Sequence, residues 1–237
     1  MFGLAGAGKT EALYTLKEQA HTQQQLIPTI GFNVETVSSI GDLLSTTKNM
    51  RLTLWDVGGH PKITVLWRHY LNNRHGYVFV IDSANTNHYS EQNSSEPFDS
   101  FQDMMVTARE ELTTILHYED CAHGAPLLIL ANKQDLKQAY GMYDIAEHLN
   151  LTEQQATDAN KRVARVEQVL RDHVRPALPV SIVNVIVDML PWHDVKGVTL
   201  KGDHPFMIFE CIATQYDTLV PAFTWFLQQI QKFNKRK

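Results

Sequence analysis

Gly3-Leu4-Ala5-Gly6-Ala7-Gly8-Lys9-Thr10 has the spacing G-x-x-x-x-G-K-[ST] of a phosphate-binding loop. Such a loop wraps a pyrophosphate with inward-pointing backbone N–H groups, which requires the conformational freedom of glycine. Lys9 would place an ammonium on the β- and γ-phosphates, and Thr10 would offer a hydroxyl to Mg²⁺. The helix expected over Glu11–Gln19 would point its positive N-terminus at the same phosphates. A glycine- and alanine-rich turn before a helix is the plainer alternative.

The composition favours a single globular domain that does not bind nucleic acid. The chain has 237 residues, of which 43% are hydrophobic and 20% charged. Its net charge of −5 argues against a nucleic-acid contact surface, which needs excess lysine and arginine. The basic end, Lys232 with 235–237, is better explained as a solvated helix terminus than as a lipid contact. The scarcity of cysteine and the lack of a recognisable secretory signal or bilayer-spanning apolar run predict a cytoplasmic location.

Short apolar segments alternate with helical patterns, which predicts an α/β protein with three layers around a mostly parallel sheet. The expected buried strands are apolar and rich in β-branched or aromatic residues: 51–57, 76–82, 126–131 and 207–213. Helices are expected over 98–116, 142–149 and 217–233. Ligands bind beyond the carboxyl ends of the strands in such sheets. Asp56, Asn132 and Ala213 fall at those ends.

Some stretches do not suit the sheet scaffold, and we expect them to be insertions in one domain spanning 1–237: about 38–49, 83–99 and 151–205. The first is a polar connection inside an expected hairpin, and the second, rich in Ser and Asn, suggests a flexible loop. The third is expected to be a helical insertion before the last strand, since apolar residues from Ala159 to Leu170 recur at 4-3-4 spacing. The apolar run Val180–Leu190 would pack on the main domain, with a partner-binding or membrane-surface helix as the alternative.

Asp56-Val57-Gly58-Gly59 and an upstream threonine are expected to complete the phosphate end of the site. Asp56 would hold Mg²⁺ through water, and Gly59 would turn its backbone N–H onto a γ-phosphate. Thr29 lies in a connection beside Pro28, where it would ligate Mg²⁺ only when a triphosphate is bound. Each motif is also compatible with a simple turn.

Asn132-Lys133-Gln134-Asp135 follows an apolar strand and is expected to recognise the base. Asp135 would accept hydrogen bonds from the ring N–H and the exocyclic amine of guanine, a donor pair that adenine lacks. Asn132 and Lys133 would brace the loop and flank the base. Ala213, followed by Thr214 at the end of the last predicted strand, would offer a backbone N–H to the guanine carbonyl. For the segment 132–135, a polar turn that caps the next helix is the alternative.

These motifs, in this order, make the chain resemble the ADP-ribosylation factor (Arf/Arl) family of small GTPases. The most specific stretches are 28–37, Trp55–Gly59 with 66–70, and 131–136. The resemblance implies a P-loop NTPase fold and a GTP-binding switch that binds GTP or GDP with Mg²⁺. It also implies exchange factors, GTPase-activating proteins and effectors as partners, and a role in vesicle trafficking. A peripheral position on Golgi or other endomembranes would follow.

The predicted site residues fall into groups. The catalytic residues are His60, Gly59, Lys9 and Thr29, and the metal residues are Thr10, Thr29 and Asp56 through water. By resemblance, effectors would read an aromatic trio, with ordinary core packing as the alternative: Phe32, Trp55 and Tyr70. The nucleotide-binding residues are Gly3, Leu4, Ala5, Gly6, Ala7, Gly8, Lys9, Thr10, Glu11, Gly59, Asn132, Lys133, Asp135, Ala213 and Thr214.

The chain departs from the family pattern at informative positions. His60 stands where the family has a glutamine that orients the attacking water, and imidazole cannot offer an amide's simultaneous donor and acceptor. Slow intrinsic hydrolysis is therefore predicted. Glu11 replaces a threonine and is expected to face away from the phosphates. Only Met1 and Phe2 precede the loop, so the family's N-terminal helix and first strand are expected to be missing and the neighbouring strands unpaired.

Other functional classes remain open at this stage. One is a nucleotide-binding scaffold that has lost useful hydrolysis and acts through its insertions. His60 and the long stretch 151–205 favour that class. A small P-loop kinase or ATPase is the other, and the guanine-recognition motif at 132–135 argues against it.

Overall fold

The computed structural model describes residues 1–18, 29–37, 52–85, 101–118, 121, 124–151 and 205–236. The predicted insertion at 38–49, most of the one at 83–99 and the interior of 151–205 lie outside these residues. The expected helical insertion and the apolar run Val180–Leu190 therefore also lie outside them.

A parallel sheet forms the centre of the described fold. It contains β3 (Tyr77–Asp82), β4 (Leu127–Asn132) and β5 (Phe206–Glu210), in the order β3-β4-β5. Every residue of β3 and β4 is buried, as expected for strands covered on both faces. In the register, Tyr77 lies opposite Leu127, and Leu127 lies opposite Phe206. The predicted strand 207–213 is too long, because β5 ends at Glu210.

An antiparallel hairpin was expected from the sequence, and it forms a second, separate sheet. Its strands are β1 (Phe32–Val37) and β2 (Leu52–Val57), with Phe32 opposite Val57. Alternate residues of β2 are buried at its start, so one face of the hairpin packs on the core while the other meets solvent. The expectation that 51–57 is a strand buried on both faces is wrong, because of this alternation. The hairpin packs mainly against α1 (Lys9–Glu18).

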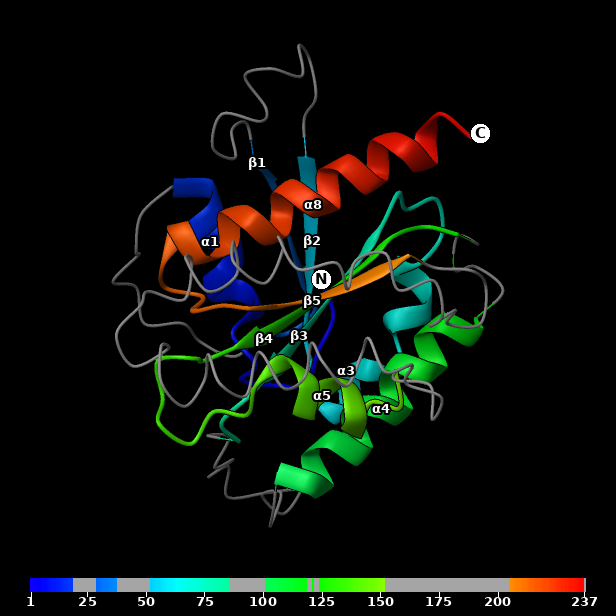
Figure 1. Ribbon diagram of the computed structural model, residues 1–237. Coiled ribbons are helices and arrows are strands. Elements are labelled where there is room, and N and C mark those ends of the chain that lie inside the picture. The colour runs from blue at the N-terminus through cyan, green and yellow to red at the C-terminus, as the bar shows by residue number, and fades with distance from the viewer. Residues whose placement is uncertain are drawn as a thin grey trace, which may run out of the picture.

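Met1 and Phe2 connect the two sheets. The backbone N–H of Val57 donates to Met1 O at 3.1 Å, and the Met1 amine donates to Trp55 O. On the other side, Phe2 N donates to Val78 O at 2.8 Å and Val80 N donates to Phe2 O at 2.9 Å. The expectation that the strands flanking this position would be unpaired is therefore wrong where these bonds form. The N-terminus accordingly lies in the middle of the molecule (Figure 1).

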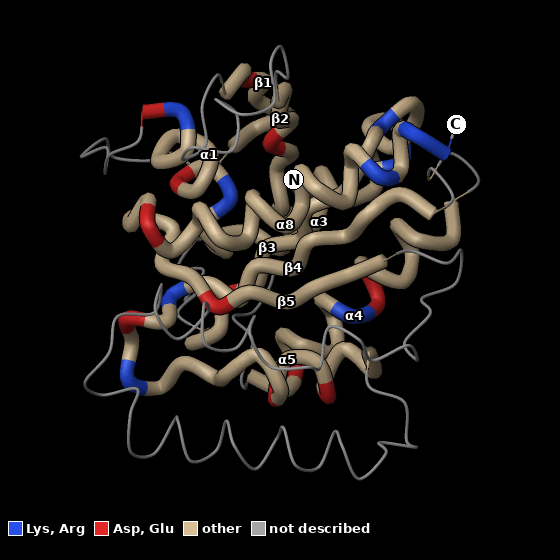
Figure 2. Tube along the Cα trace, turned by 45° about the horizontal axis from the view of Figure 1, so that its top comes forward, with Lys and Arg blue, Asp and Glu red and all other residues tan. Residues whose placement is uncertain are grey.

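Helices cover both faces of the parallel sheet, which gives the predicted three layers (Figures 1 and 2). Apolar side chains on α1 and α8 (Tyr216–Asn234) form one core with the sheet residues Val78 and Val80. The alternate residues Tyr77, Phe79 and Ile81 pack into a second core with α4 (Phe101–His117) and α5 (Met142–His148). Successive strand residues point to opposite faces, so one continuous apolar run supplies both cores.

The observed helices agree with the expected ones to within a few residues. α8 buries side chains at the 3–4 residue spacing of an amphipathic helix, from Leu219 through Phe226 to Phe233. Truncating a buried ring such as Phe226 would cost about 3–5 kcal/mol. Short helices α3 (Pro61–Thr64) and η1 (Trp67–Tyr70) follow β2. Among the described helices, none combines the length and apolarity that a membrane crossing requires.

Candidate nucleotide site

The glycine-rich loop joins the N-terminal residues to α1 and is closed by its own lysine. Lys9 begins α1, and its ammonium donates to Gly3 O at 2.8 Å and Leu4 O at 2.9 Å. An ammonium has three donors, so one more is available to a phosphate oxygen. Gly8 has a φ of +98°, and a Cβ there would lie 2.2 Å from Asn132 Nδ2. The predicted loop residues Gly3, Leu4, Ala5, Gly6, Ala7 and Gly8 therefore form one turn before α1.

The charge of Lys9 is held in a buried place. Only 6% of the residue is exposed. Burial, partly offset by the Asp56 carboxylate, lowers the pKa of Lys9 to about 8. An anion at this point would favour the charged ammonium. Glu11, also predicted here, lies in the first turn of α1 and is partly buried.

Gly59 lies directly against the backbone of the loop. A Cβ at Gly59 would fall 2.2 Å from Gly3 O and 2.6 Å from Ala5 N. Such approaches are far inside van der Waals contact, so any larger residue would displace the loop. The sequence suggested a flexible glycine for the γ-phosphate, and the structure adds a packing reason for the same residue.

The predicted metal residues converge beside the loop. Thr10 Oγ1 donates to Asp56 Oδ2 at 2.5 Å and lies 3.0 Å from Thr29 Oγ1. Asp56 is completely buried, and Asn33 Nδ2 also donates to its Oδ2 at 3.5 Å. The other oxygen, Asp56 Oδ1, is buried without a hydrogen-bond partner among the described residues. Hydroxyl and carboxylate oxygens are the ligand types that Mg²⁺ takes, and the unpartnered oxygen suits a cation or its water.

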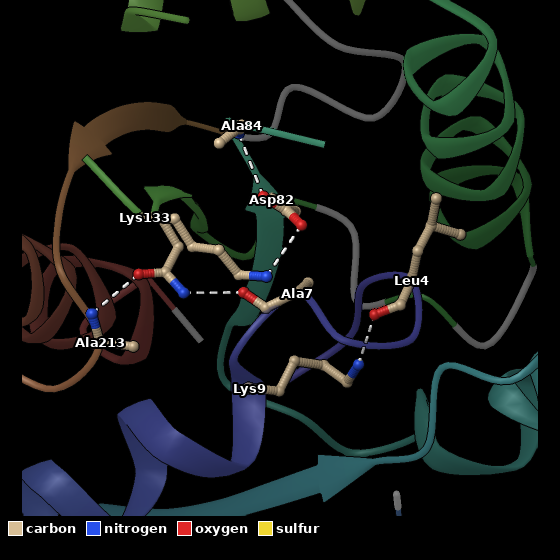
Figure 3. A network of polar contacts seen from close by, with 8 residues as sticks. Leu4, Ala7, Lys9, Asp82, Ala84, Lys133 and Ala213 are labelled. Carbon is tan, nitrogen blue, oxygen red and sulfur yellow. Dashed lines mark hydrogen bonds and ion pairs between the residues drawn. The ribbon is translucent and has the colours of Figure 1, made fainter. Parts of the chain in front are cut away.

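The base end is organised by Asn132. Its Nδ2 donates to Ala7 O of the loop at 2.8 Å, and its Oδ1 accepts from Ala213 N at 2.8 Å (Figure 3). The Ala213 N–H expected to meet a guanine carbonyl is thus engaged by Asn132 in this structure. Thr214 follows Ala213 in a turn. Cys211 is buried next to Asn132, with its Sγ 3.9 Å from Asn132 Oδ1. Burial raises the pKa of Cys211, so its thiol stays protonated.

Asp135 presents an exposed carboxylate at this end. Its side chain makes no hydrogen bond or ion pair with another described residue, so both oxygens are available to a base. The neighbouring Lys133 pairs with Asp82 at 2.8 Å. Thr10, Thr29 and Asp56 together are called the metal corner below. The phosphate loop, the metal corner and the 132–135 segment all lie at the carboxyl ends of the strands, as the sequence predicted.

The sequence profile of the ADP-ribosylation factor family matches residues 1–96 and 98–185. The chain belongs to this family. It is accordingly a small GTPase, a GTP-binding switch protein whose ligand is a guanine nucleotide.

Solved structures with the same fold support the assignment of the architecture. One is the Arl6 BBS3 small GTPase from Trypanosoma brucei with a bound nucleotide analogue, GppNp, with a TM-score of 0.59 and 22% identity. That match covers 98% of this chain and 95% of the other. Another is the mammalian SRP receptor, with a TM-score of 0.58 and 20% identity over 97% of each chain. At these identities the likeness concerns the fold.

His60, one of the predicted catalytic residues, begins a short helix in the structure. It is the N-cap of α3, and its Nδ1 accepts a hydrogen bond from Lys62 N at 3.2 Å. The neutral ring then carries its proton on Nε2, where it is a donor. The ring's acceptor nitrogen is therefore directed at the helix backbone.

The aromatic trio expected from the Arf resemblance does come together on the surface. Phe32 stacks on Trp55 with ring centroids 5.3 Å apart, and Tyr70 lies 5.2 Å from Phe32. Phe32 is 45% exposed. The sequence reasoning missed Arg74, whose guanidinium lies 4.2 Å from the Trp55 ring centroid and whose Nε donates to Tyr70 O at 2.9 Å.

Other missed residues support the base end from within the Arf fold. Gln134 is buried, and its Nε2 donates to Tyr140 O at 2.9 Å. Glu210, at the end of β5, accepts from Met142 N at 3.0 Å and so caps α5. No local sequence pattern predicts these contacts. Glu210 could have been noticed as an acid that ends an apolar strand.

Proposed function

We propose that this chain is a Mg²⁺-dependent switch that binds GTP and GDP and controls intracellular vesicle trafficking through effectors. The observation that carries the proposal is the convergence of Thr10, Thr29 and Asp56 beside the phosphate loop. Thr10 comes from the loop, Thr29 from the segment before β1, and Asp56 from β2. A cation held by all of them would link the state of the phosphates to the position of the β1–β2 hairpin.

The residues of the phosphate end would divide the work. Lys9 would balance charge on the β- and γ-phosphates through its remaining donor, and Gly59 would offer its N–H to the γ-phosphate. Thr10 and Thr29 would hold Mg²⁺ through their hydroxyls, and Asp56 through a water. Bound there, Mg²⁺ supplies charge neutralisation between the β- and γ-phosphates. The unpartnered Oδ1 of Asp56 supports this fit.

Hydrolysis is proposed to be slow in the isolated chain. His60 caps α3 through Nδ1, so the ring's acceptor is used for the helix rather than for an attacking water. Single-turnover GTP hydrolysis by the wild type and by His60→Gln measures the effect. We expect the variant to be faster, and a faster wild type would contradict this part of the proposal.

Effectors are proposed to bind over Phe32, Trp55 and Tyr70, an aromatic cluster on the hairpin and η1 in which Phe32 is exposed and the other two rings are partly buried. Phe32 and Trp55 lie on the hairpin that also carries Asn33 to Asp56, so their position can follow the nucleotide. Exchange factors and GTPase-activating proteins would set the balance of states. The proposed location is cytoplasmic, with peripheral contact with Golgi or other endomembranes.

A second candidate function is a nucleotide-binding scaffold without useful hydrolysis, which the capping role of His60 favours. Turnover distinguishes the two. A switch should hydrolyse GTP when cell extract supplies a GTPase-activating protein, whereas a scaffold should retain GTP even then.

Binding of mant-GDP and mant-GTP, with and without Mg²⁺, tests the main proposal. Thr10→Asn should weaken mant-GTP binding more than mant-GDP binding and should remove most of the Mg²⁺ dependence. Thr107→Asn, at an exposed hydroxyl on α4, is the matched control and should leave both affinities unchanged. Equal affinities with and without Mg²⁺ in the wild type would overturn the metal assignment.

A further inference from the structure

A buried acid, Asp82, lies next to the base-recognition loop (132–140). It belongs to none of the nucleotide-binding motifs found in the sequence. Asp82 is the last residue of β3, and its side chain is fully buried. Its Oδ2 accepts from Lys133 Nζ at 2.8 Å, and its Oδ1 accepts from Ala84 N at 3.1 Å (Figure 3). Each carboxylate oxygen therefore has a donor aimed at it.

Lys133 is held between two fixed points. Its backbone has a φ of +66°, in the left-handed region, and it follows Asn132, which is bonded both to Ala7 and to Ala213. Its ammonium ends on Asp82. Because both ends are fixed, the hydrocarbon stem between them is fixed as well. The side chain as a whole is 23% exposed.

The same end of β3 also holds the far end of the recognition loop. Tyr140 N donates to Ser83 O at 2.8 Å, and Gln134 Nε2 donates to Tyr140 O at 2.9 Å. The ring of Tyr140 stacks on Phe101 at a centroid distance of 3.8 Å. The segment that carries Asp135 is thus attached to β3 at its start through Asp82 and at its end through Ser83.

We propose that Asp82 is a positioning residue for nucleotide binding: it fixes the Lys133 side chain so that its stem forms one wall of the base site. The proposal rests on the proposed guanine-nucleotide function. Asp82 acts through Lys133 and has no contact of its own with the base. A buried ion pair adds little net stability, because removing both charges from water costs about as much as their attraction gains. Its benefit here is that it holds a long side chain in a single position.

The Asp82 side chain is fully buried and the Lys133 side chain is not. Removing one partner should therefore lower stability by a different amount than removing the other. Without Lys133, the buried carboxylate of Asp82 loses its ion-pair partner, which is strongly destabilising. Without the charge of Asp82, the side chain of Lys133, which is 23% exposed, can move toward water at little cost. Lys133→Met should therefore lower the unfolding temperature more than Asp82→Asn does. The double variant should recover much of the loss.

The test is the dissociation rate of mant-GDP from the full chain with Mg²⁺. We expect Asp82→Asn to release mant-GDP about tenfold faster, the effect of roughly one well-placed contact. Adding Lys133→Met to Asp82→Asn should change the rate by less than about twofold, because a Lys133 stem that is no longer anchored has already stopped supporting the base. Glu147→Gln removes an exposed acid on α5 and should match the wild type.

The possible outcomes separate the proposals. A wild-type rate in Asp82→Asn overturns the role of Asp82 and leaves the guanine-nucleotide function standing. A much faster rate in the double variant than in Asp82→Asn also overturns it, because Lys133 would then act without Asp82. A wild-type chain with no affinity for mant-GDP overturns both proposals.

Discussion

The phosphate end of the site is made of buried charges, whereas the base end presents an exposed carboxylate on buried supports. Lys9 and Asp56 are 6% and 0% exposed and lie close enough for their charges to interact. Asp135 faces solvent, and its position depends on Asn132 and Gln134 beneath it. At the phosphate end the buried charges themselves would meet the ligand, whereas at the base end the buried contacts position an exposed acceptor.

The difference indicates how the two ends divide affinity and selectivity. Charge attracts any polyphosphate regardless of its base, and burial strengthens the attraction. A fixed acceptor with no other partner rewards one donor pattern and penalises others. Changes at the phosphate end should therefore alter affinity regardless of which base the nucleotide carries, and changes at the base end should alter the preference between bases.

The largest expected effect follows removal of the buried ammonium. Lys9→Met should weaken GDP and ADP binding by a similar factor, about 100-fold, which corresponds to one or two charge-assisted hydrogen bonds. Isothermal titration with both nucleotides measures it. Lys17→Met, at an exposed lysine on the same helix, is the control. A large loss for GDP alone would show that Lys9 takes part in selecting the base.

A smaller effect is expected where the loop meets Gly59. Gly59→Ala places a Cβ 2.2 Å from Gly3 O and should cost about 2 kcal/mol of unfolding free energy in urea. Gly76→Ala also creates a clash, with a Cβ 2.6 Å from the Phe226 ring, but against a side chain outside the phosphate loop. Both variants should be less stable, and the first should bind GTP more weakly. Equal GTP affinities would show that Gly59 does not shape the phosphate end.

The pH dependence should be more modest. Burial lowers the pKa of Lys9 from 10.5 to about 8. Below pH 8 the folded chain therefore holds a buried ammonium, whose desolvation lowers the stability of the fold. The contribution of Lys9 to stability without nucleotide should rise as pH rises from about 8 to 10.5. Phosphates favour the charged form, so GDP affinity should fall over the same range, by up to about tenfold per unit. Lys9→Arg should be flat because arginine stays charged. A flat wild-type profile would contradict the assignment.

The phosphate end was predictable from sequence because its residues are contiguous or close to strand ends. The loop 3–10 sits where its spacing indicates, and Thr10, Thr29 and Asp56 meet as expected. The strand–helix alternation likewise gave the three layers. Boundaries were less certain: β5 stops at Glu210 because Cys211 O accepts from Gln134 N, outside the ladder.

The supports of the base end were not predictable, because their partners are distant along the chain. Asp82 and Lys133 are 51 positions apart, and nothing in either local pattern indicates the other. The N–H of Ala213 was expected to meet the base, but the side chain of Asn132 binds it. Arg74 and Glu210 likewise act through contacts that only the folded chain creates.

Displacement of mant-GDP by unlabelled GDP and by ADP, from the wild type and from Asp135→Ala, shows whether Asp135 selects guanine. We expect the wild type to prefer GDP by at least about 100-fold, since ADP leaves the carboxylate unpaired. Asp135→Ala should lose most of that preference while binding ADP as the wild type does. Equal displacement of mant-GDP by GDP and ADP from the wild type would contradict this role of Asp135.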